Sequence, residues 1–198
     1  ANALDMGRGG CLAAFRTLMD EHPDWLREQL AGARQDAFAA ELLALLPLVG
    51  VWRCEGEASH PSWEESDRFM QQVTIAHDGR PFLTYESRAW RLDKPGGEVV
   101  GPAFREVGFW RPQPDDTIEL LITHSTGVTE MFFGKPRNQT SWEFGTDAVL
   151  RTPSAEDVTA ASRLYGVVEG ALAYVEERAT SEHELQPRLS AKLDRVVG

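Results

Sequence analysis

The sequence predicts an all-β protein: an up-and-down antiparallel barrel of about ten strands, preceded by a helical segment. From Gly50 onward, short runs alternate apolar and polar residues, and Gly, Pro, Asn or Asp residues separate most of these runs. No apolar pattern in this part is long enough for the helix of a βαβ crossover. A sandwich fits the same alternation, but short hairpin connections favour a closed barrel, because closure removes exposed strand edges.

The chain before Gly50 has the spacing of helices. Apolar residues recur at helical intervals over 12–19 and again over 24–30, and Pro23 separates the two runs. A third apolar run, Phe38 to Leu46, is also expected to be helical up to the following proline. Its density of leucines could close one end of the barrel.

This change of pattern gives the domain organisation: a helical N-terminal extension over residues 1–41 and a barrel domain over residues 42–198. Within the barrel domain, the sequence His-Asp-Gly-Arg at 77–80 indicates a hairpin, because Asp-Gly accepts the positive φ angles of tight turns. The predicted strands are 52–58, 69–75, 82–90, 104–111, 117–124, 128–133, 141–150, 158–167, 172–180 and 189–196.

Charge and cysteine content limit the class of protein. The formal net charge is −11 over 198 residues. An acidic surface repels phosphate groups, so we expect no nucleic-acid partner and no membrane partner. No apolar run reaches the roughly 18 residues of a membrane-spanning helix. Cys11 and Cys54 lie in segments of different character, which fits two thiols in a reducing cytoplasm better than a disulfide.

The chain carries no recognised hydrolase, phosphate-binding or dinucleotide-binding motif. Its histidines do not recur at the spacing of a metal site, so we predict no metal bound by protein ligands alone. His77 at a hairpin start and His124 at a strand end could each face a barrel mouth. An ordinary turn or surface histidine fits each position as well.

Aromatic residues leave the nature of the barrel interior open. Four tryptophans fall within predicted strands: Trp52, Trp90, Trp110 and Trp142. Large aromatic side chains can line a barrel and leave an apolar pocket, but plain core packing gives the same pattern. The pattern alone therefore does not separate a ligand cavity from a filled core.

Several motifs together resemble those of one family. Gly50, Trp52 and Gly56 stand at positions of a GxWxGxG signature, in which Cys54 replaces the middle glycine. Further segments are similar, in consistent order, to the motifs SHxGKPxxxY, ExGxxR, AHPTGxxE and LxPHLxAxL, and they span 77–85, 105–111, 123–130 and 185–193. On these motifs the chain resembles the nitrobindins, haem proteins with a barrel like that of fatty-acid-binding proteins.

The resemblance extends from Leu45 to Val197, and the segment before Leu42 has no counterpart in it. It implies a ten-stranded, lipocalin-like barrel, a cytoplasmic setting and often a homodimer. In the family, ferric haem lies in a cleft at one barrel end, and the histidine of LxPHLxAxL binds its iron. Members bind nitric oxide and isomerise peroxynitrite to nitrate. The resemblance also places His77 across the haem from that histidine and Ser62 at a threonine of the cleft.

Arg188 stands where the resemblance implies the iron-binding histidine. A guanidinium stays protonated and offers no lone pair, so it cannot bind iron. We therefore expect no cofactor in the family manner, with haem possible only through a substitute ligand such as His183. Arg188 could instead clamp the carboxylate of a ligand, or pair with a nearby acid of the chain.

Three interpretations remain open. The first is a barrel that binds an apolar or amphipathic small molecule, such as a fatty acid or a macrocycle, with Ser62, His77 and Arg188 in its cavity. The second is a ferric haem protein acting as a peroxynitrite isomerase or nitric oxide binder. The third is an interaction protein with a filled barrel. We favour the first and expect the isomerase activity to be lost.

Overall fold

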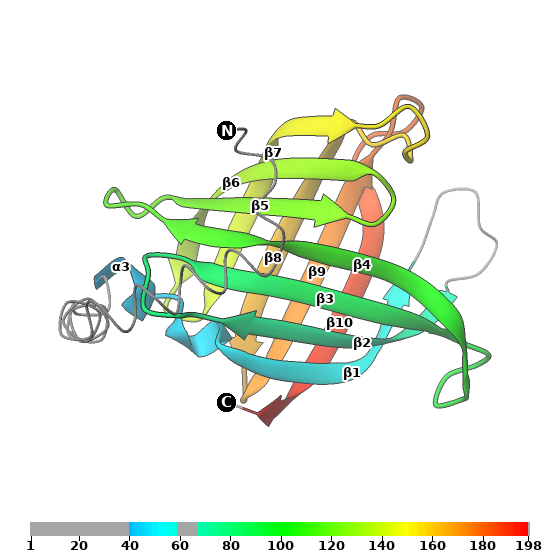
Figure 1. Cartoon of the computed structure of the whole chain (residues 1–198), viewed down its shortest axis with the longest axis horizontal. Coiled ribbons are helices and arrows are strands. Elements are labelled where there is room, and N and C mark those ends of the chain that lie inside the picture. Colours follow the sequence, from blue (N-terminus) through cyan, green and yellow to red (C-terminus); the bar gives the residue numbers. More distant parts are fainter. Residues whose placement is uncertain (1–39, 59–66, 198) are drawn as a thin grey trace, which may run out of the picture. The chain divides into compact units, whose positions relative to one another are not determined.

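Residues 40–58 and 67–197, which the computed structural model describes, form a closed barrel of antiparallel strands. Each strand pairs with the next along the chain, and the last returns to the first, so the predicted fold class is confirmed (Figure 1). The strands are β1 (Gly50–Ala58), β2 (Asp67–Ala76), β3 (Leu83–Leu92), β4 (Val99–Pro112), β5 (Ile118–His124), β6 (Val128–Asn138), β7 (Ser141–Arg151), β8 (Ala160–Val168), β9 (Ala171–Ala179) and β10 (Gln186–Val197).

Period-two alternation explains why these segments form strands with one buried face. In β5, for example, Ile118, Leu120 and Ile122 are buried, and the residues between them are more exposed. The described connections range from two-residue turns to the loop 152–159, and β8 and β9 are linked by Glu169 and Gly170, which both have positive φ angles. Two such residues form the turn whose twist matches that of the flanking strands, so this hairpin needs its glycine.

The largest extensions beyond the predicted strands occur in β4 and β6. β4 begins at Val99 instead of residue 104. Its first residues are exposed or half-buried and show no alternation, so the sequence pattern did not predict them as a strand. β6 continues to Asn138 instead of residue 133. There Gly134 and Pro136 have the composition of a turn, yet Pro136 still pairs with Trp142 at the end of the ladder.

Within the described residues, the helix predicted from Phe38 to Leu46 ends earlier than expected. Helix α3 spans Ala40–Leu43, and a 3-10 turn, η1, spans Leu46–Leu48. Leu42, Leu45 and Leu48 are fully buried, and their spacing of three matches the period of a 3-10 helix rather than an α-helix. The remainder of the predicted extension lies outside the described residues.

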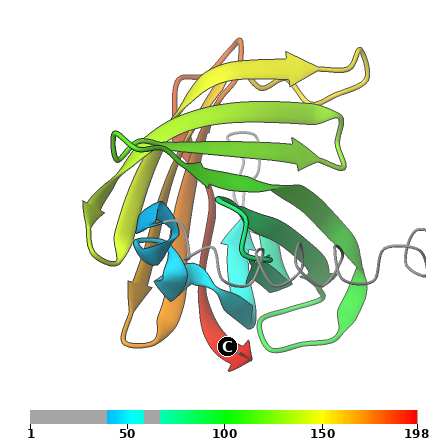
Figure 2. The same cartoon turned by 60° about the vertical axis from the view of Figure 1, so that its left-hand side comes forward.

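Residues 40–49, which we call the plug, lie at one opening of the barrel (Figure 2). The Nε1 atom of Trp52 donates a hydrogen bond to the carbonyl of Leu48 at 2.9 Å. Arg195, from the end of β10, donates hydrogen bonds to the carbonyls of Pro47 and Val49, and its guanidinium lies 4.1 Å from the centre of the Trp52 ring system. The plug is therefore fixed to both strands at the seam of the barrel.

The interior changes character from the plug end to the opposite end. The inward positions of β9 read Leu172, Tyr174, Glu176 and Arg178 in that direction. Trp52, Trp110 and Trp142 are fully buried near the plug, whereas Trp90 is only half-buried. Three of the four strand tryptophans thus fill the core.

Among the described residues, no helix is long and apolar enough to cross a membrane.

Candidate functional site

The end of the barrel opposite the plug, which we call the mouth, is bordered by the connections 93–98, 125–127, 152–159 and 180–185. Buried charged side chains gather just inside it. Arg163 on β8 is the innermost cation, and its side chain is 1% exposed. Its Nη2 atom lies 2.8 Å from Glu106 Oε1 on β4 and 2.5 Å from Glu176 Oε2 on β9. Arg163 therefore neutralises carboxylates from two separate strands.

Tyrosines complete the contacts of this inner group. Tyr85 donates a hydrogen bond to Glu106 Oε2 at 2.9 Å, and Arg163 Nη1 donates one to the hydroxyl of Tyr165 at 3.0 Å. Tyr165 stacks on Tyr174 with ring centroids 5.6 Å apart. These rings separate the charged side chains from the tryptophans near the plug.

His124 lies between two buried carboxylates. Its Nε2 atom is 2.6 Å from Glu130 Oε2, and its Nδ1 atom is 3.3 Å from Glu106 Oε1. An imidazole can donate a hydrogen bond from both ring nitrogens only when it is protonated. Both ring nitrogens of His124 therefore already contact carboxylates.

Arg178 connects this group to the mouth. Its Nη2 atom lies 2.9 Å from Glu176 Oε1 and 3.8 Å from Glu130 Oε2. Its Nη1 atom donates a hydrogen bond to Glu156 Oε2 at 3.0 Å. Glu156 belongs to the 152–159 connection, so a loop of the mouth supplies the outermost carboxylate.

Arg188 reaches the same carboxylate from β10. Pro187 pairs with Glu177 and Leu189 with Glu176, so Arg188 is the extra residue of a β-bulge. A bulge re-aims a side chain that strict alternation would turn to the other face. Here the Arg188 side chain is mostly buried, and its Nη2 atom lies 3.9 Å from Glu156 Oε1.

Acidic and basic side chains face one another in this mouth cluster. It comprises four carboxylates, three arginines and one histidine: Glu106, Glu130, Glu156, Glu176, Arg163, Arg178, Arg188 and His124. Three buried atoms of the cluster that also form no ion pair, Glu130 Oε1, Arg163 Nε and Arg178 Nε, have no hydrogen-bond partner among the residues that the structure describes. Buried polar atoms are normally satisfied, so the cluster retains capacity for further polar contacts.

The cluster keeps the carboxylates of Glu106 and Glu130 ionised. Burial alone would raise the pKa of Glu106, but the charges of Arg163 and His124, with hydrogen bonds from Arg163 and Tyr85, lower it to about 2. Burial also opposes ionisation of Glu130, yet the hydrogen bond from His124 and the charges of Arg163 and Arg178 hold its pKa below the usual range. The mouth therefore presents fixed charges rather than neutral polar groups.

One wall of the mouth is apolar. Phe69 on β2 meets Phe104 on β4 edge to face, with ring centroids 5.2 Å apart, and Leu189 belongs to the same core. The Phe69 ring lies across Gly56, where an added Cβ would come within 2.4 Å of Phe69 Cζ. The mouth thus combines this apolar wall with the charged cluster.

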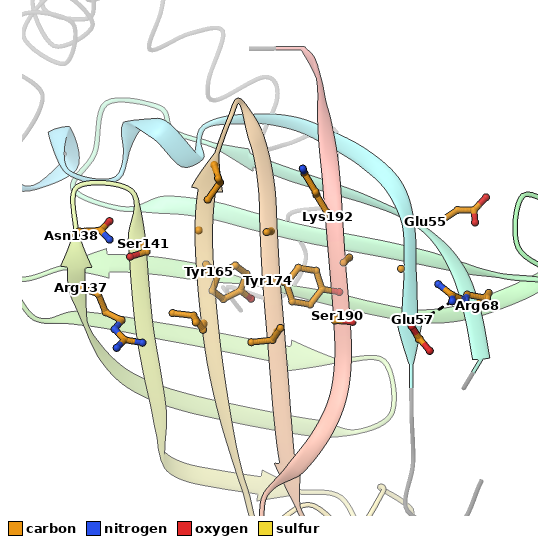
Figure 3. Close-up of a pocket in the computed structure, with 17 residues that line it drawn as sticks. Glu55, Glu57, Arg68, Arg137, Asn138, Ser141, Tyr165, Tyr174, Ser190 and Lys192 are labelled. Carbon is orange, nitrogen blue, oxygen red and sulfur yellow. Dashed lines mark ion pairs between the residues drawn. The ribbon is translucent and has the colours of Figure 1, made fainter. Parts of the chain in front are cut away.

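Two hollows adjoin the strands of the mouth. One, of about 400 Å³, lies beside Arg188 and is lined by Val175, Pro187 and Leu189 together with glutamates. The other, of about 900 Å³, is a groove on the outer face of β8, β9 and β10, with Arg137 on one side and Glu55 and Glu57 on the other (Figure 3). Neither hollow reaches Arg163 or Glu106 in the barrel interior.

Sequence comparisons identify the family. The family model described as the THAP4-like, heme-binding β-barrel domain matches residues 41–195. This chain belongs to that family. It is 84% identical over 156 residues to a ferric nitrobindin-like protein of Saccharopolyspora erythraea, an alignment that covers 79% of this chain and 74% of the relative. The predicted membership of the nitrobindin family is therefore confirmed.

This chain is also similar to a relative with a different name and to a solved structure. A protein of Mycolicibacterium smegmatis named peroxynitrite isomerase 2 is 51% identical over 165 residues, covering 79% of this chain and 74% of that protein. The crystal structure of Rv2717c from M. tuberculosis superposes with a TM-score of 0.70 at 29% identity, covering 80% of this chain and 98% of that one.

The structure does not bring the predicted cavity residues together. Gly50 pairs with Ile75, so the β2–β3 connection with His77 lies at the plug end. Leu189 pairs with Ala58, at the other end of β1. At about 3.3 Å per residue, the strand separates His77 from Arg188 by roughly 25 Å, so placing both in one cavity was wrong. Ser62 lies outside the described residues.

The signature of β1 has a structural role in this family member. Gly50 has a φ of 150°, and an added Cβ there would lie 2.8 Å from the carbonyl of Val197. Trp52 anchors the plug, Cys54 packs against the core, and Gly56 admits Phe69. These residues close the seam between β1 and β10 rather than forming a ligand site.

The described histidines do not provide the iron ligand that the resemblance implies. Of the two alternatives left open for His124, the structure shows the one toward the mouth, but both its nitrogens contact carboxylates. His77 lies at the plug end, and His183 is exposed on the 180–185 connection. Arg188 and the described histidines therefore do not fit iron ligation of the kind that the family motif implies.

Sequence reasoning missed most of the mouth cluster. Glu106, Arg163, Glu176 and Arg178 were not singled out, although each occupies a buried position of its strand. The available signal was a charged residue at an inward position of an alternating strand, such as Arg163 between Ala161 and Tyr165. Four such positions, on β4, β8 and β9, would have indicated an ion-paired interior.

Proposed function

We propose that this member of the family binds an amphipathic small molecule at its mouth, without ligating haem iron in the manner implied by the resemblance. The observation that carries the proposal is Arg188: it stands at the expected ligand position, in a β-bulge, and engages a carboxylate. We place this activity in the cytoplasm, in line with the free thiol of Cys54.

The chemistry of the mouth matches such a ligand. Phe69, Phe104 and Leu189 offer apolar surface to the body of the molecule. Arg178 and Arg188 offer guanidinium groups to an anionic end, and guanidinium favours planar oxyanions such as carboxylates.

A second candidate function follows from the relatives named peroxynitrite isomerase. That activity would need haem held by a substitute ligand, and His183 is the described histidine on a connection of the mouth. An exposed loop histidine is a poor iron ligand, because nothing in its surroundings fixes the orientation of its ring. We therefore rank this function second.

Binding of 11-(dansylamino)undecanoate, followed by its fluorescence, tests the first function. We expect saturable binding to the wild type and weaker binding to Arg188→Ala, because the variant loses one cation of the mouth. Arg137→Ala is the matched control, since Arg137 is an exposed arginine beside the outer groove. Absence of binding to the wild type, or weakening by Arg137→Ala alone, would contradict a ligand site at the mouth.

A further inference from the structure

The carboxylate of Glu156 bridges two arginines of the mouth. Its Oε2 atom accepts a hydrogen bond from Arg178 at 3.0 Å, and its Oε1 atom lies 3.9 Å from Arg188 Nη2. Two cations facing the two oxygens of one carboxylate form a site for that functional group. The chain thus occupies this site with its own side chain.

Glu156 is also the carboxylate of the cluster that can leave most easily. Its side chain is 29% exposed, whereas those of Glu106, Glu130 and Glu176 are almost completely buried. Moving a partly exposed carboxylate into water costs little, because water solvates it well. The buried carboxylates have no comparable route to solvent.

The loop that carries Glu156 is held by its neighbour in the sequence. Asp157 forms an ion pair with Arg151, and its Oδ2 atom accepts hydrogen bonds from the backbone and the hydroxyl of Ser181. Val158 is buried as well. The Glu156 side chain can therefore swing out while the 152–159 connection stays in place.

We propose that Glu156 is a tethered competitor, which means that a ligand carboxylate binds Arg178 and Arg188 by displacing the Glu156 carboxylate. This proposal rests on the proposed function. The exchange conserves the charge of the cluster, since one carboxylate replaces another beside the same two arginines. An alcohol or an ester would leave the two arginines short of one negative charge. The site therefore selects carboxylates that carry an apolar tail.

Calorimetric titration with octanoate and with octanol tests this exchange. We expect Glu156→Gln to bind octanoate about tenfold more tightly than the wild type, which corresponds to roughly 1.4 kcal/mol. The affinity for octanol should not change, because the alcohol does not compete for the arginines. Glu182→Gln is the control: it removes an exposed carboxylate of the adjacent connection and so changes the net charge equally.

Each result separates this inference from the proposed function. Equal octanoate affinity in Glu156→Gln and the wild type, or an equal gain for octanol, would overturn the competitor role while binding itself stood. An equal gain in Glu182→Gln would reduce the effect to net charge and overturn it as well. Failure of octanoate, octanol and the dansyl probe to bind any variant would overturn the proposed function too. Circular dichroism of both glutamine variants establishes that they fold.

Discussion

The two halves of the barrel interior are built from the same strands but stabilised differently. On β4, Trp110 lies toward the plug, where it contacts three aromatic rings edge to face: Trp142, Phe144 and Tyr165. On the same strand, Glu106 lies toward the mouth among charged groups. Removing one apolar side chain leaves a cavity, but removing one charge leaves its partners unpaired. The plug half therefore secures the fold, and the mouth half depends on a complete set of charges.

The largest expected effect concerns the plug half. Trp110→Ala should lower the free energy of unfolding by about 4 kcal/mol, because a fully buried ring is lost from an interlocked aromatic group. Urea denaturation followed by far-ultraviolet circular dichroism measures it. A loss below about 1 kcal/mol would mean that the aromatic group does not support the barrel.

The next effect concerns the mouth half. Arg163→Met should lower the free energy of unfolding by about 3 kcal/mol, since Glu106 and Glu176 would lose their buried counter-charge. Arg105→Met is the control, because Arg105 pairs with Glu86 at the surface and such pairs contribute at most about 1 kcal/mol. Equal losses in the two variants would contradict a buried network at the mouth.

The pH dependence of stability distinguishes the two halves further. The pKa of Glu106 is about 2 in the folded protein against an ordinary value of 4.5. A lowered pKa contributes stability that is fully present above about pH 4.5 and is lost as the pH falls toward 2. Glu106→Gln should therefore show a shallower loss of stability over this window than the wild type.

Trp110→Ala serves as the comparison for this titration, because it leaves Glu106 and its partners in place. Its stability should be lower at every pH but should keep the wild-type slope. The measurement is the free energy of unfolding from urea titrations at several pH values. A wild-type slope in Glu106→Gln would show that Glu106 is not held ionised by the cluster.

The sequence predicted the fold better than the site. Alternation and turn residues identified the strands, because each strand buries one face and each connection is short. The strand ends at Val99 and Asn138 were not predicted, because exposed or turn-like residues there do not alternate between apolar and polar. Arg188 was singled out through its place in a motif, and the structure adds the bulge that directs it to Glu156.

The other members of the mouth cluster could not be predicted in the same way. Glu106, Glu156 and Arg178 lie on β4, on the 152–159 connection and on β9, and only barrel closure brings them together. His77 shows the opposite error: its motif places it near a ligand, but the register of β1 and β2 puts it at the plug end. Contacts between distant segments follow from register, which composition does not encode.

We propose that Arg188 forms an ion pair with Glu156 at the position where the family motif implies an iron-binding histidine. Titration of the wild type and Arg188→His with haemin, followed by absorption spectroscopy, tests it most directly. We predict no specific haem spectrum for the wild type and a sharp histidine-ligated spectrum for Arg188→His. A stoichiometric five-coordinate spectrum for the wild type, lost in His183→Ala, would contradict the claim and move the isomerase function to first place.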